Sequence, residues 1–329
     1  MICASVGVDI GGTGTKIVYF SNGELSFKQS YPTDKNGGIK AVLVNIKKFC
    51  SKYHIDTSNA IIGFSTPGVW GEKNGKETVL GSCANLPWLA ESNIIELAKD
   101  KFSVAYCYGL NDAKCQIYGQ TIFGNAKGGK VVVGLTLGTG VGGAVIINGK
   151  IFLGASGKGG EFGHISIRPL TPSRKCNCGN FGCLEAYCGT VGIIETLKEE
   201  ISFYHDAGEL QDGERKNIKK IFELAKNKPF SNSACLQTII KTAHYLADGL
   251  APLLNAFEPD IVVFDGQISR DLPMMEKTIF AALEERLSQR FLFDCLKIVQ
   301  SSDPEYSGAI GASAYALSRS QGLEVIMKF

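Results

Sequence analysis

Hydrophobic residues are arranged along the chain in two kinds of segment, one with the spacing of a helix and one typical of a buried strand. Apolar residues recur at helical spacing in residues 39–50 and again in residues 236–257, where a Glu-Pro-Asp sequence ends the run. Residues 261–266 (IVVFDG) then form a β-branched and aromatic run that is typical of a buried strand. Residues 307–319 again have a helical pattern. Strands that alternate with helices in this way predict α/β domains.

Two segments of the chain share one order of features. In each, a strand-like run meets a glycine-rich turn, a second strand-like run follows, and an Asn-Gly pair ends the segment. The first begins near Val6, turns at Gly11–Gly14 and ends at Asn22-Gly23, and the second begins near Val132 and ends at Asn148-Gly149. Asn-Gly pairs favour the two-residue turns of β-hairpins. We interpret the segments as an internal duplication of a phosphate-sized turn, one in each domain.

The second segment also matches a dinucleotide-binding motif by spacing alone. Gly138, Gly140 and Gly143 satisfy G-x-G-x-x-G, but that motif requires a following helix whose N-terminus binds the pyrophosphate. The sequence that follows, AVIING, is a β-branched run that ends in a hairpin turn. This context excludes a Rossmann domain, and the sequence has no G-x-x-x-x-G-K-[ST] loop.

Length and composition limit the picture further. A chain of 329 residues with 44% hydrophobic and 20% charged residues is globular and suits two domains of ordinary size. The net charge of +2 gives no electrostatic basis for binding nucleic acid or a membrane surface, so we expect neither partner. The N-terminal sequence lacks the pattern of a secretory signal, and most of the 11 cysteines are isolated. We therefore expect a cytoplasmic protein with reduced thiols.

The expected domain boundary lies between the two hairpins. GQTIFGNAKGGK, Gly119 to Lys130, separates the helix that follows Asn111-Asp112-Ala113 from the second hairpin. We predict a smaller N-terminal α/β domain of residues 1–117 and a larger C-terminal α/β domain of residues 118–305. Residues 306–329 are expected to form a helix that packs back on the first domain.

Three cysteines lie within eight residues, at Cys176, Cys178 and Cys183. His164 is the natural fourth ligand, and together these side chains form the Cys₃His set that binds Zn²⁺ tetrahedrally. A redox pair or three unrelated core thiols are the alternatives, but the spacing favours zinc. Four protein ligands complete the coordination sphere, so we expect the metal to be structural.

Two carboxylates flank this cysteine cluster. A zinc-bound histidine has its second ring nitrogen fixed in direction. Glu161 and Glu185 carry polar groups close to the same place, so zinc would hold side chains in position for recognising a hydroxyl-rich ligand. From the residues alone, solvated surface charges explain both glutamates equally well.

The longest motif of the chain resembles a family signature. LTLGTGVGGAVIINGKIFLGASGKGGEFGHISI followed by CNCGNFGCLE is similar to the signature of ROK (repressor, open reading frame, kinase) proteins, which are sugar kinases and sugar-responsive repressors of the actin-like ATPase superfamily. The resemblance extends over nearly the whole chain through DIGGTGTK, GFSTPGVW, NLPW, NDA and GAIGAS. It implies an α/β fold of two ribonuclease-H-like domains, with the active site in the cleft between them and a zinc knuckle.

The resemblance also implies a role for each matched position. Asp112 would be the general base that takes the proton of the attacking sugar hydroxyl. Hydrogen bonds to the hexose would come from six side chains: Asn85, Asn111, Asp112, Glu161, His164 and Glu185. ATP and Mg²⁺ would be bound by Asp9, Lys16, Gly266 and the two glycine-rich turns, namely Gly11, Gly12 and Thr13, and Gly138, Thr139 and Gly140.

Several of these positions have a plainer alternative in the sequence. An aspartate between an asparagine and a helix is usually an N-cap, and the residues alone favour that interpretation of Asp112. Asp9 precedes glycines, which is the position of a turn former. Lys16 departs from the family pattern, in which lysine directly follows Asp-Ile-Gly-Gly-Thr, and a surface position suits it equally well.

The combined interpretation is an ATP-dependent hexose kinase that phosphorylates glucose at O6. N-acetylmannosamine, N-acetylglucosamine, mannose and fructose are alternative acceptors, because relatives share the sugar-contacting residues. A non-catalytic sugar-sensing regulator is the alternative from another class. Repressors of the family carry a helix-turn-helix domain ahead of the kinase-like core, whereas here the first hairpin begins within the first ten residues. We also expect a homodimer, and this expectation comes only from the family resemblance.

Overall fold

The fold is described from a computed structural model, for residues 4–81, 83, 85–170, 172–205, 208–287 and 296–322. The first of two compact units comprises the described parts of Met1–Lys130, Ala144–Gly160 and Ser301–Phe329, and the second those of Val131–Gly143 and Glu161–Gln300. Helix α4 (Asp112–Ile122), which includes the predicted boundary at residue 117, lies wholly in the first unit. Of the predicted C-terminal helix, residues 323–329 lie outside the described residues.

The first five-stranded sheet has the order β3-β2-β1-β4-β7. β1, β2 and β3 are antiparallel neighbours, whereas β1, β4 and β7 run parallel. The carboxyl ends of the parallel strands β1, β4 and β7 therefore lie at the same edge of the sheet. The strands are β1 (Ala4–Ile10), β2 (Gly14–Ser21), β3 (Glu24–Pro32), β4 (Ile61–Thr66) and β7 (Cys107–Asn111).

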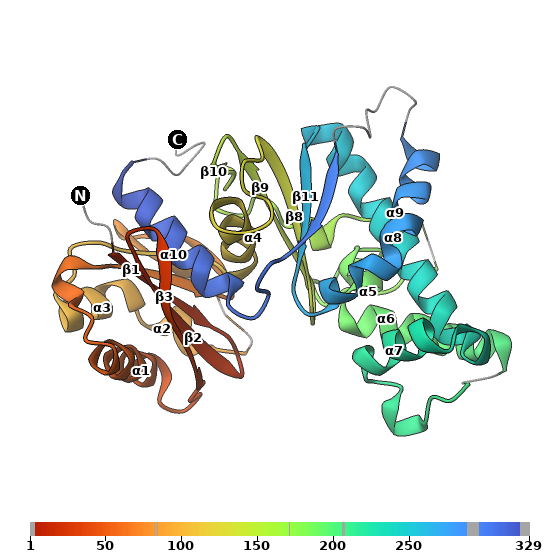
Figure 1. The fold of residues 1–329 in the computed structure, drawn as a ribbon, viewed down its shortest axis with the longest axis horizontal. Helices are drawn as coiled ribbons and strands as arrows, with labels where there is room; N and C mark the ends of the chain where they lie inside the picture. The colour runs from red at the N-terminus through yellow and green to blue at the C-terminus, as the bar shows by residue number, and fades with distance from the viewer. Residues whose placement is uncertain are drawn as a thin grey trace. The chain divides into compact units, whose positions relative to one another are not determined.

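Helices α1 and α10 both lie against this sheet (Figure 1). The β1 residues that meet them alternate along the strand. Val6 and Val8 belong to the same buried cluster as the α1 side chains Val42 and Ile46. Gly7 faces α10 instead, and a Cβ there would lie 1.9 Å from the Ala309 carbonyl oxygen, so only glycine allows this close approach. The other elements of this part of the chain are α1 (Gly38–Lys52), η1 (Thr57–Asn59), β5 (Val69–Lys73), β6 (Lys76–Leu80), α2 (Trp88–Glu91), α3 (Ile94–Phe102) and α10 (Ser307–Ser320).

The second five-stranded sheet has the order β10-β9-β8-β11-β12, with β11 parallel to both β8 and β12. Its strands are β8 (Val131–Leu137), β9 (Val141–Ile147), β10 (Lys150–Ile151), β11 (Ile261–Asp265) and β12 (Lys297–Gln300). The long helix α8 (Ser233–Phe257) packs against α6 (Thr190–Tyr204), α7 (Ile218–Asn227) and α9 (Leu272–Arg286). Shorter elements are η2 (Phe162–His164), α5 (Glu185–Cys188), η3 (Asp212–Glu214), η4 (Pro229–Ser231) and η5 (Ile268–Asp271).

The structure confirms the elements that the hydrophobic pattern predicts. Residues 39–50 lie in α1, 236–257 in α8 and 307–319 in α10, and β11 covers 261–265. Both Asn-Gly pairs have positive φ at each residue (53° and 82° at Asn22-Gly23, 52° and 75° at Asn148-Gly149), as a type I′ hairpin turn requires. β9 follows the second glycine turn as a strand, which confirms that the Rossmann motif is absent there. None of the helices in the described part of the chain is both long and apolar enough to cross a membrane.

Candidate active site and metal centre

Polar side chains gather where the parallel strands of the first sheet end. Asp9 is the penultimate residue of β1, and its register partner on β4 is Ser65. Asn111 ends β7 beside Thr66, and Asp112 directly follows as the first residue of α4. This edge is where α/β folds place ligand-binding groups. The register of the sheet thus brings two predicted carboxylates, Asp9 and Asp112, to the same place.

Asp9 is only 7% exposed, and three features hold its carboxylate. Ser65 Oγ donates a hydrogen bond to Asp9 Oδ1 at 2.6 Å, and Lys16 Nζ lies 3.8 Å from Oδ2. Burial raises the pKa of Asp9, while Lys16 and Ser65 act in the opposite direction. A Cβ at Gly308 would lie 2.7 Å from the carboxyl carbon of Asp9, so the first turn of α10 abuts the carboxylate. The positive end of that helix favours a negative charge there.

Gly308→Ala is therefore expected to destabilise the protein. The added methyl group forces the Asp9 carboxylate or the start of α10 to move, and such overpacking costs about 1–3 kcal/mol. That cost exceeds the gain of up to about 1 kcal/mol that alanine brings to a helix interior. Urea unfolding measures the difference, and Gly213→Ala is the control, because a Cβ there meets no atom within 4 Å. A Gly308→Ala protein as stable as the wild type would contradict the packing described here.

The structure shows that Asp112 is not the N-cap of α4, contrary to what the residues alone favour. Asn111 is the N-cap of α4: its Oδ1 accepts a hydrogen bond from Lys114 N at 3.2 Å. Asp112 is not needed as a cap, and its own Oδ1 accepts from Asn111 Nδ2 at 3.0 Å and from Ala113 N at 2.8 Å. Asn111 Nδ2 also donates to the Gly68 carbonyl oxygen at 3.1 Å, so the predicted sugar ligand Asn111 uses its amide to hold Asp112.

The surroundings of Asp112 shift the pKa of its carboxyl group upward. Burial raises its pKa to about 6, and the nearby charge of Asp9 acts in the same direction. The hydrogen bond from Ala113 N and the charge of Lys114 lower the pKa and limit the shift. A carboxyl group with a pKa near the working pH is suited to general-base catalysis.

The first glycine turn lies at the same edge. Gly11 N donates to the Gly14 carbonyl oxygen at 3.0 Å and closes the turn, whereas Gly12 N and Thr13 N make no such bond within the described residues. Backbone N–H groups of this kind, in a glycine-rich turn, can bind an anion. Asn85 is exposed beside them, since a Cβ on Gly12 would lie 3.7 Å from the Asn85 Cβ.

The second glycine turn is closed in a similar way. Gly138 N donates to the Gly140 carbonyl oxygen at 3.0 Å. Gly266, at the end of β11, has a φ of +91°, and a Cβ there would lie 2.3 Å from the Leu137 carbonyl oxygen. The predicted residue Gly266 therefore packs against the start of the turn, where a side chain would not fit.

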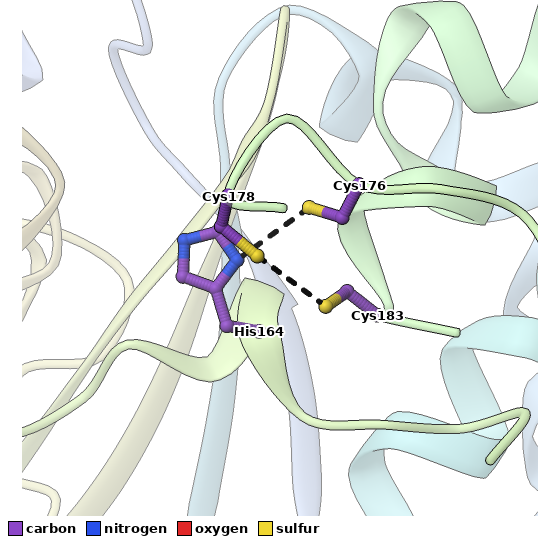
Figure 2. Close-up of side chains that lie close together, drawn as sticks. All are labelled: His164, Cys176, Cys178 and Cys183. Carbon is purple, nitrogen blue, oxygen red and sulfur yellow. Dashed lines mark hydrogen bonds between the residues drawn. The ribbon is translucent and has the colours of Figure 1, made fainter. Parts of the chain in front are cut away.

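The cysteine cluster forms a compact set of metal ligands (Figure 2). One ligand atom from each of His164, Cys176, Cys178 and Cys183 lies within 4.8 Å of all the others. Cys178 Sγ and Cys183 Sγ are 3.7 Å apart, and Cys176 Sγ is 3.7 Å from His164 Nδ1. The S–S separation is close to the edge of about 3.8 Å that follows from tetrahedral Zn–S bonds of about 2.3 Å. It is far longer than a disulfide bond, which measures about 2.05 Å. The donor set and its spacing fit one zinc-sized ion.

The two predicted glutamates flank these ligands along the chain. Glu161 precedes η2, and its carbonyl oxygen accepts from His164 N at 3.1 Å. Glu185 begins α5, and its Oε2 accepts from Val141 N at 3.0 Å. His164 is exposed, and because Nδ1 faces Cys176, the other ring nitrogen points away from the cluster.

Two residues of the site were missed by sequence reasoning. Ser65 and Gly308 lie in the motifs GFSTPGVW and GAIGAS, which carry the family resemblance, but nothing in their spacing indicates contact with Asp9. Ser65 is 56 residues from Asp9 and buried. Only the strand register shows the contact.

Comparison with known proteins identifies the family. The ROK family matches residues 5–319. A glucokinase of Halalkalibacterium halodurans is 30% identical over 279 residues, which cover 80% of each chain. A glucokinase of Thermotoga maritima is 28% identical over 325 residues, covering 96% of this chain and 98% of the relative. A xylose repressor of Bacillus spizizenii is 27% identical over 325 residues, 95% of this chain and 77% of the repressor.

Solved structures agree with the predicted fold class. A ROK hexokinase of Thermus thermophilus has a TM-score of 0.76 at 23% identity, over 97% of this chain and 99% of its own. A ROK family glucokinase of Streptomyces griseus, in complex with glucose and AMPPNP, has a TM-score of 0.75 at 23% identity, over 96% and 99% of the two chains. The mixed α/β fold is that of these sugar kinases, which confirms the predicted fold class.

Proposed function

The chain belongs to the ROK family, and from this premise we propose that it is an ATP-dependent hexose kinase with glucose, phosphorylated at O6, as its acceptor. Similar glucokinases that match over most of their length support the kinase class. The glucose and AMPPNP complex of the Streptomyces griseus glucokinase supports the substrate pair. Mannose, fructose and the N-acetylhexosamines are the alternative acceptors.

The main observation in support of this proposal is the position, hydrogen bonding and pKa of Asp112. Its carboxylate lies where the parallel strands β1, β4 and β7 end, is oriented by Asn111 and Ala113, and has a pKa raised to about 6. We assign Asp112 as the general base that accepts the proton of the sugar hydroxyl as the new O–P bond forms. General-base help of this kind is worth about 10²–10⁴-fold in rate.

The nucleotide is proposed to bind at the two glycine turns. ATP would supply the phosphoryl group, and Mg²⁺ would neutralise charge on the phosphates. Gly12 N and Thr13 N of the first turn and the backbone of Thr139 and Gly140 of the second would bind phosphate oxygens. Asp9 offers the carboxylate oxygen that Mg²⁺ prefers. Lys16 is proposed to assist through its ion pair with Asp9.

The sugar is proposed to be recognised by Asn85, Asn111, Glu161, His164 and Glu185. Zn²⁺ is the proposed occupant of the Cys₃His cluster, and its chemistry there is structural. His164 then presents its second ring nitrogen in one fixed direction, which is useful for a hydrogen bond to a hydroxyl group.

A coupled ADP-release assay over a panel of hexoses and N-acetylhexosamines tests the proposal. We expect turnover that saturates with glucose, and the relative kcat/KM values rank the acceptors. Saturable sugar binding in calorimetry without turnover of any sugar would overturn the kinase assignment. It would favour the sugar-sensing regulator, the class to which the xylose repressor belongs.

The pH dependence of kcat/KM provides a separate prediction. Asp112 must be ionised to accept a proton, and burial together with Asp9 raises its pKa to about 6. We expect kcat/KM to be constant above neutrality and to fall as the pH drops through about 6. A profile that stays flat down to pH 4.5, with the protein still folded by circular dichroism, would contradict Asp112 as the base.

A further inference from the structure

The side chain of Glu185 lies between the metal ligands and the second glycine turn. Its Oε2 accepts a hydrogen bond from Val141 N at 3.0 Å, directly after the turn at Gly138–Gly140. Its Oε1 lies 3.5 Å from Cys176 Sγ. One carboxylate therefore contacts both the cysteine cluster and the backbone that follows the turn.

Close packing fixes this carboxylate against the turn. A Cβ on Gly140 would lie 2.3 Å from Glu185 Oε2, a distance at which one of the two must move. A Cβ on Gly138, in the same turn, would meet no atom within 4 Å. Only the Gly140 side of the turn faces Glu185.

The segment that leaves the cluster also supports the turn. Thr190, seven residues after Cys183, donates to the Gly138 carbonyl oxygen from both its N–H and its Oγ1, each at 3.0 Å. Thr139, Cys176 and Glu185 also line one cavity of about 290 Å³. The turn is thus hydrogen-bonded to a short segment that begins at the predicted metal ligand Cys183.

We propose that Glu185 is a positioning residue that couples the Cys₃His cluster to the Gly138–Gly140 turn, so that metal in the cluster strengthens nucleotide binding at the turn. Metal binding would fix Cys176 Sγ as a thiolate, which no longer donates a hydrogen bond to Glu185 but still limits by close contact where the Glu185 carboxylate lies. Glu185 then holds Val141 N and the turn in place. The identity of the ligand at the turn rests on the proposed function, but the coupling itself does not.

Zinc release tests the coupling without any activity measurement. Each zinc-loaded full-length variant is mixed with a chromogenic chelator, and the rate of zinc release is followed. Gly140→Ala displaces the carboxylate beside Cys176, so we expect release at least several-fold faster than in wild type, because groups next to metal ligands affect metal affinity by about 10–100-fold. Gly138→Ala is the matched control, and its release rate should equal that of wild type.

A double variant tells this coupling from general damage to the turn. In Gly140→Ala/Glu185→Ala the clashing carboxylate is gone, so the added methyl group no longer affects the cluster. We expect the double variant to release zinc at the rate of Glu185→Ala alone. Equal release from Gly140→Ala and Gly138→Ala, or independent effects of the two substitutions, would overturn the proposal.

Calorimetric measurement of MgADP binding tests whether metal in the cluster strengthens nucleotide binding. Chelation of zinc should weaken MgADP binding by wild type about tenfold. Glu185→Ala should bind MgADP weakly with or without zinc. If zinc removal weakens MgADP binding equally in wild type and in Glu185→Ala, the coupling is wrong. If none of the hexoses is phosphorylated but zinc removal weakens MgADP binding only in wild type, the kinase assignment alone is wrong.

Discussion

Asp112→Asn is expected to lower kcat by about 10²–10⁴-fold while the affinity for the hexose changes little. Asparagine keeps an oxygen that can accept from Ala113 N, so the local hydrogen bonding survives. It has no site of comparable basicity for the proton of the sugar hydroxyl, so the loss falls on the chemical step. Turnover and calorimetric sugar binding separate the two effects.

The same substitution, Asp112→Asn, is expected to raise the stability of the protein although it lowers the activity. Asp112 has a pKa of about 6 in the folded protein, against an ordinary value of 3.8 for aspartate, so its ionised form opposes folding at neutral pH. That penalty disappears as the pH falls from about 6 towards 4. After allowance for solvent screening, Asp112→Asn should gain on the order of 1 kcal/mol at pH 8 and nothing at pH 4.

Asp212→Asn is the control for both measurements. The Asp212 side chain is 88% exposed and belongs to neither proposed site. Its substitution should leave turnover and stability near wild type. An Asp112→Asn enzyme with turnover within threefold of wild type would remove Asp112 as the base, whatever its stability.

Local sequence signals predict the hairpins and the cysteine cluster because both depend on neighbouring residues. An Asn-Gly pair requires positive φ at adjacent positions, and three cysteines within eight residues can converge on one ion without help from distant elements. The residues alone favour Asp112 as the N-cap, and this is wrong: Asn111, a residue type that caps helices equally well, caps α4. The hydrogen bond that Asn111 accepts from Lys114 N shows this.

Contacts between distant segments explain what the sequence could not supply. Ser65 reaches Asp9 through the register of two parallel strands, and Gly308 reaches it from a helix that begins nearly 300 residues later. Glu185 was predicted from its place beside the cysteines, but its contact with Val141 depends on how α5 packs near the β8–β9 turn. A residue can be found from a local motif while its partner is set by the fold.

Removal of zinc from the Cys₃His cluster is expected to unfold the segment around it. In the described residues between 165 and 184 there is no helix or strand, only two isolated bridges, Ser166–Cys183 and Lys175–Phe181. A loop of this length needs some other source of order, and a metal bound by four side chains provides it. We expect chelation to lower the stability by on the order of 3 kcal/mol, or Tm by roughly 10 °C.

Variants of single ligands make this expectation specific. Cys176 is 4% exposed and contacts Glu185, whereas Cys178 is exposed, so Cys176→Ser should destabilise more than Cys178→Ser although both lose zinc. Trypsin should then cleave after Arg174 or Lys175, and hydrogen exchange should quicken in residues 172–184. Cys188→Ala is the control, because this buried thiol lies 3.9 Å from the Thr242 carbonyl oxygen and outside the ligand set. Equal digestion of the zinc-loaded and chelated proteins would show that the segment is ordered by its own packing, and zinc would then have no structural role here.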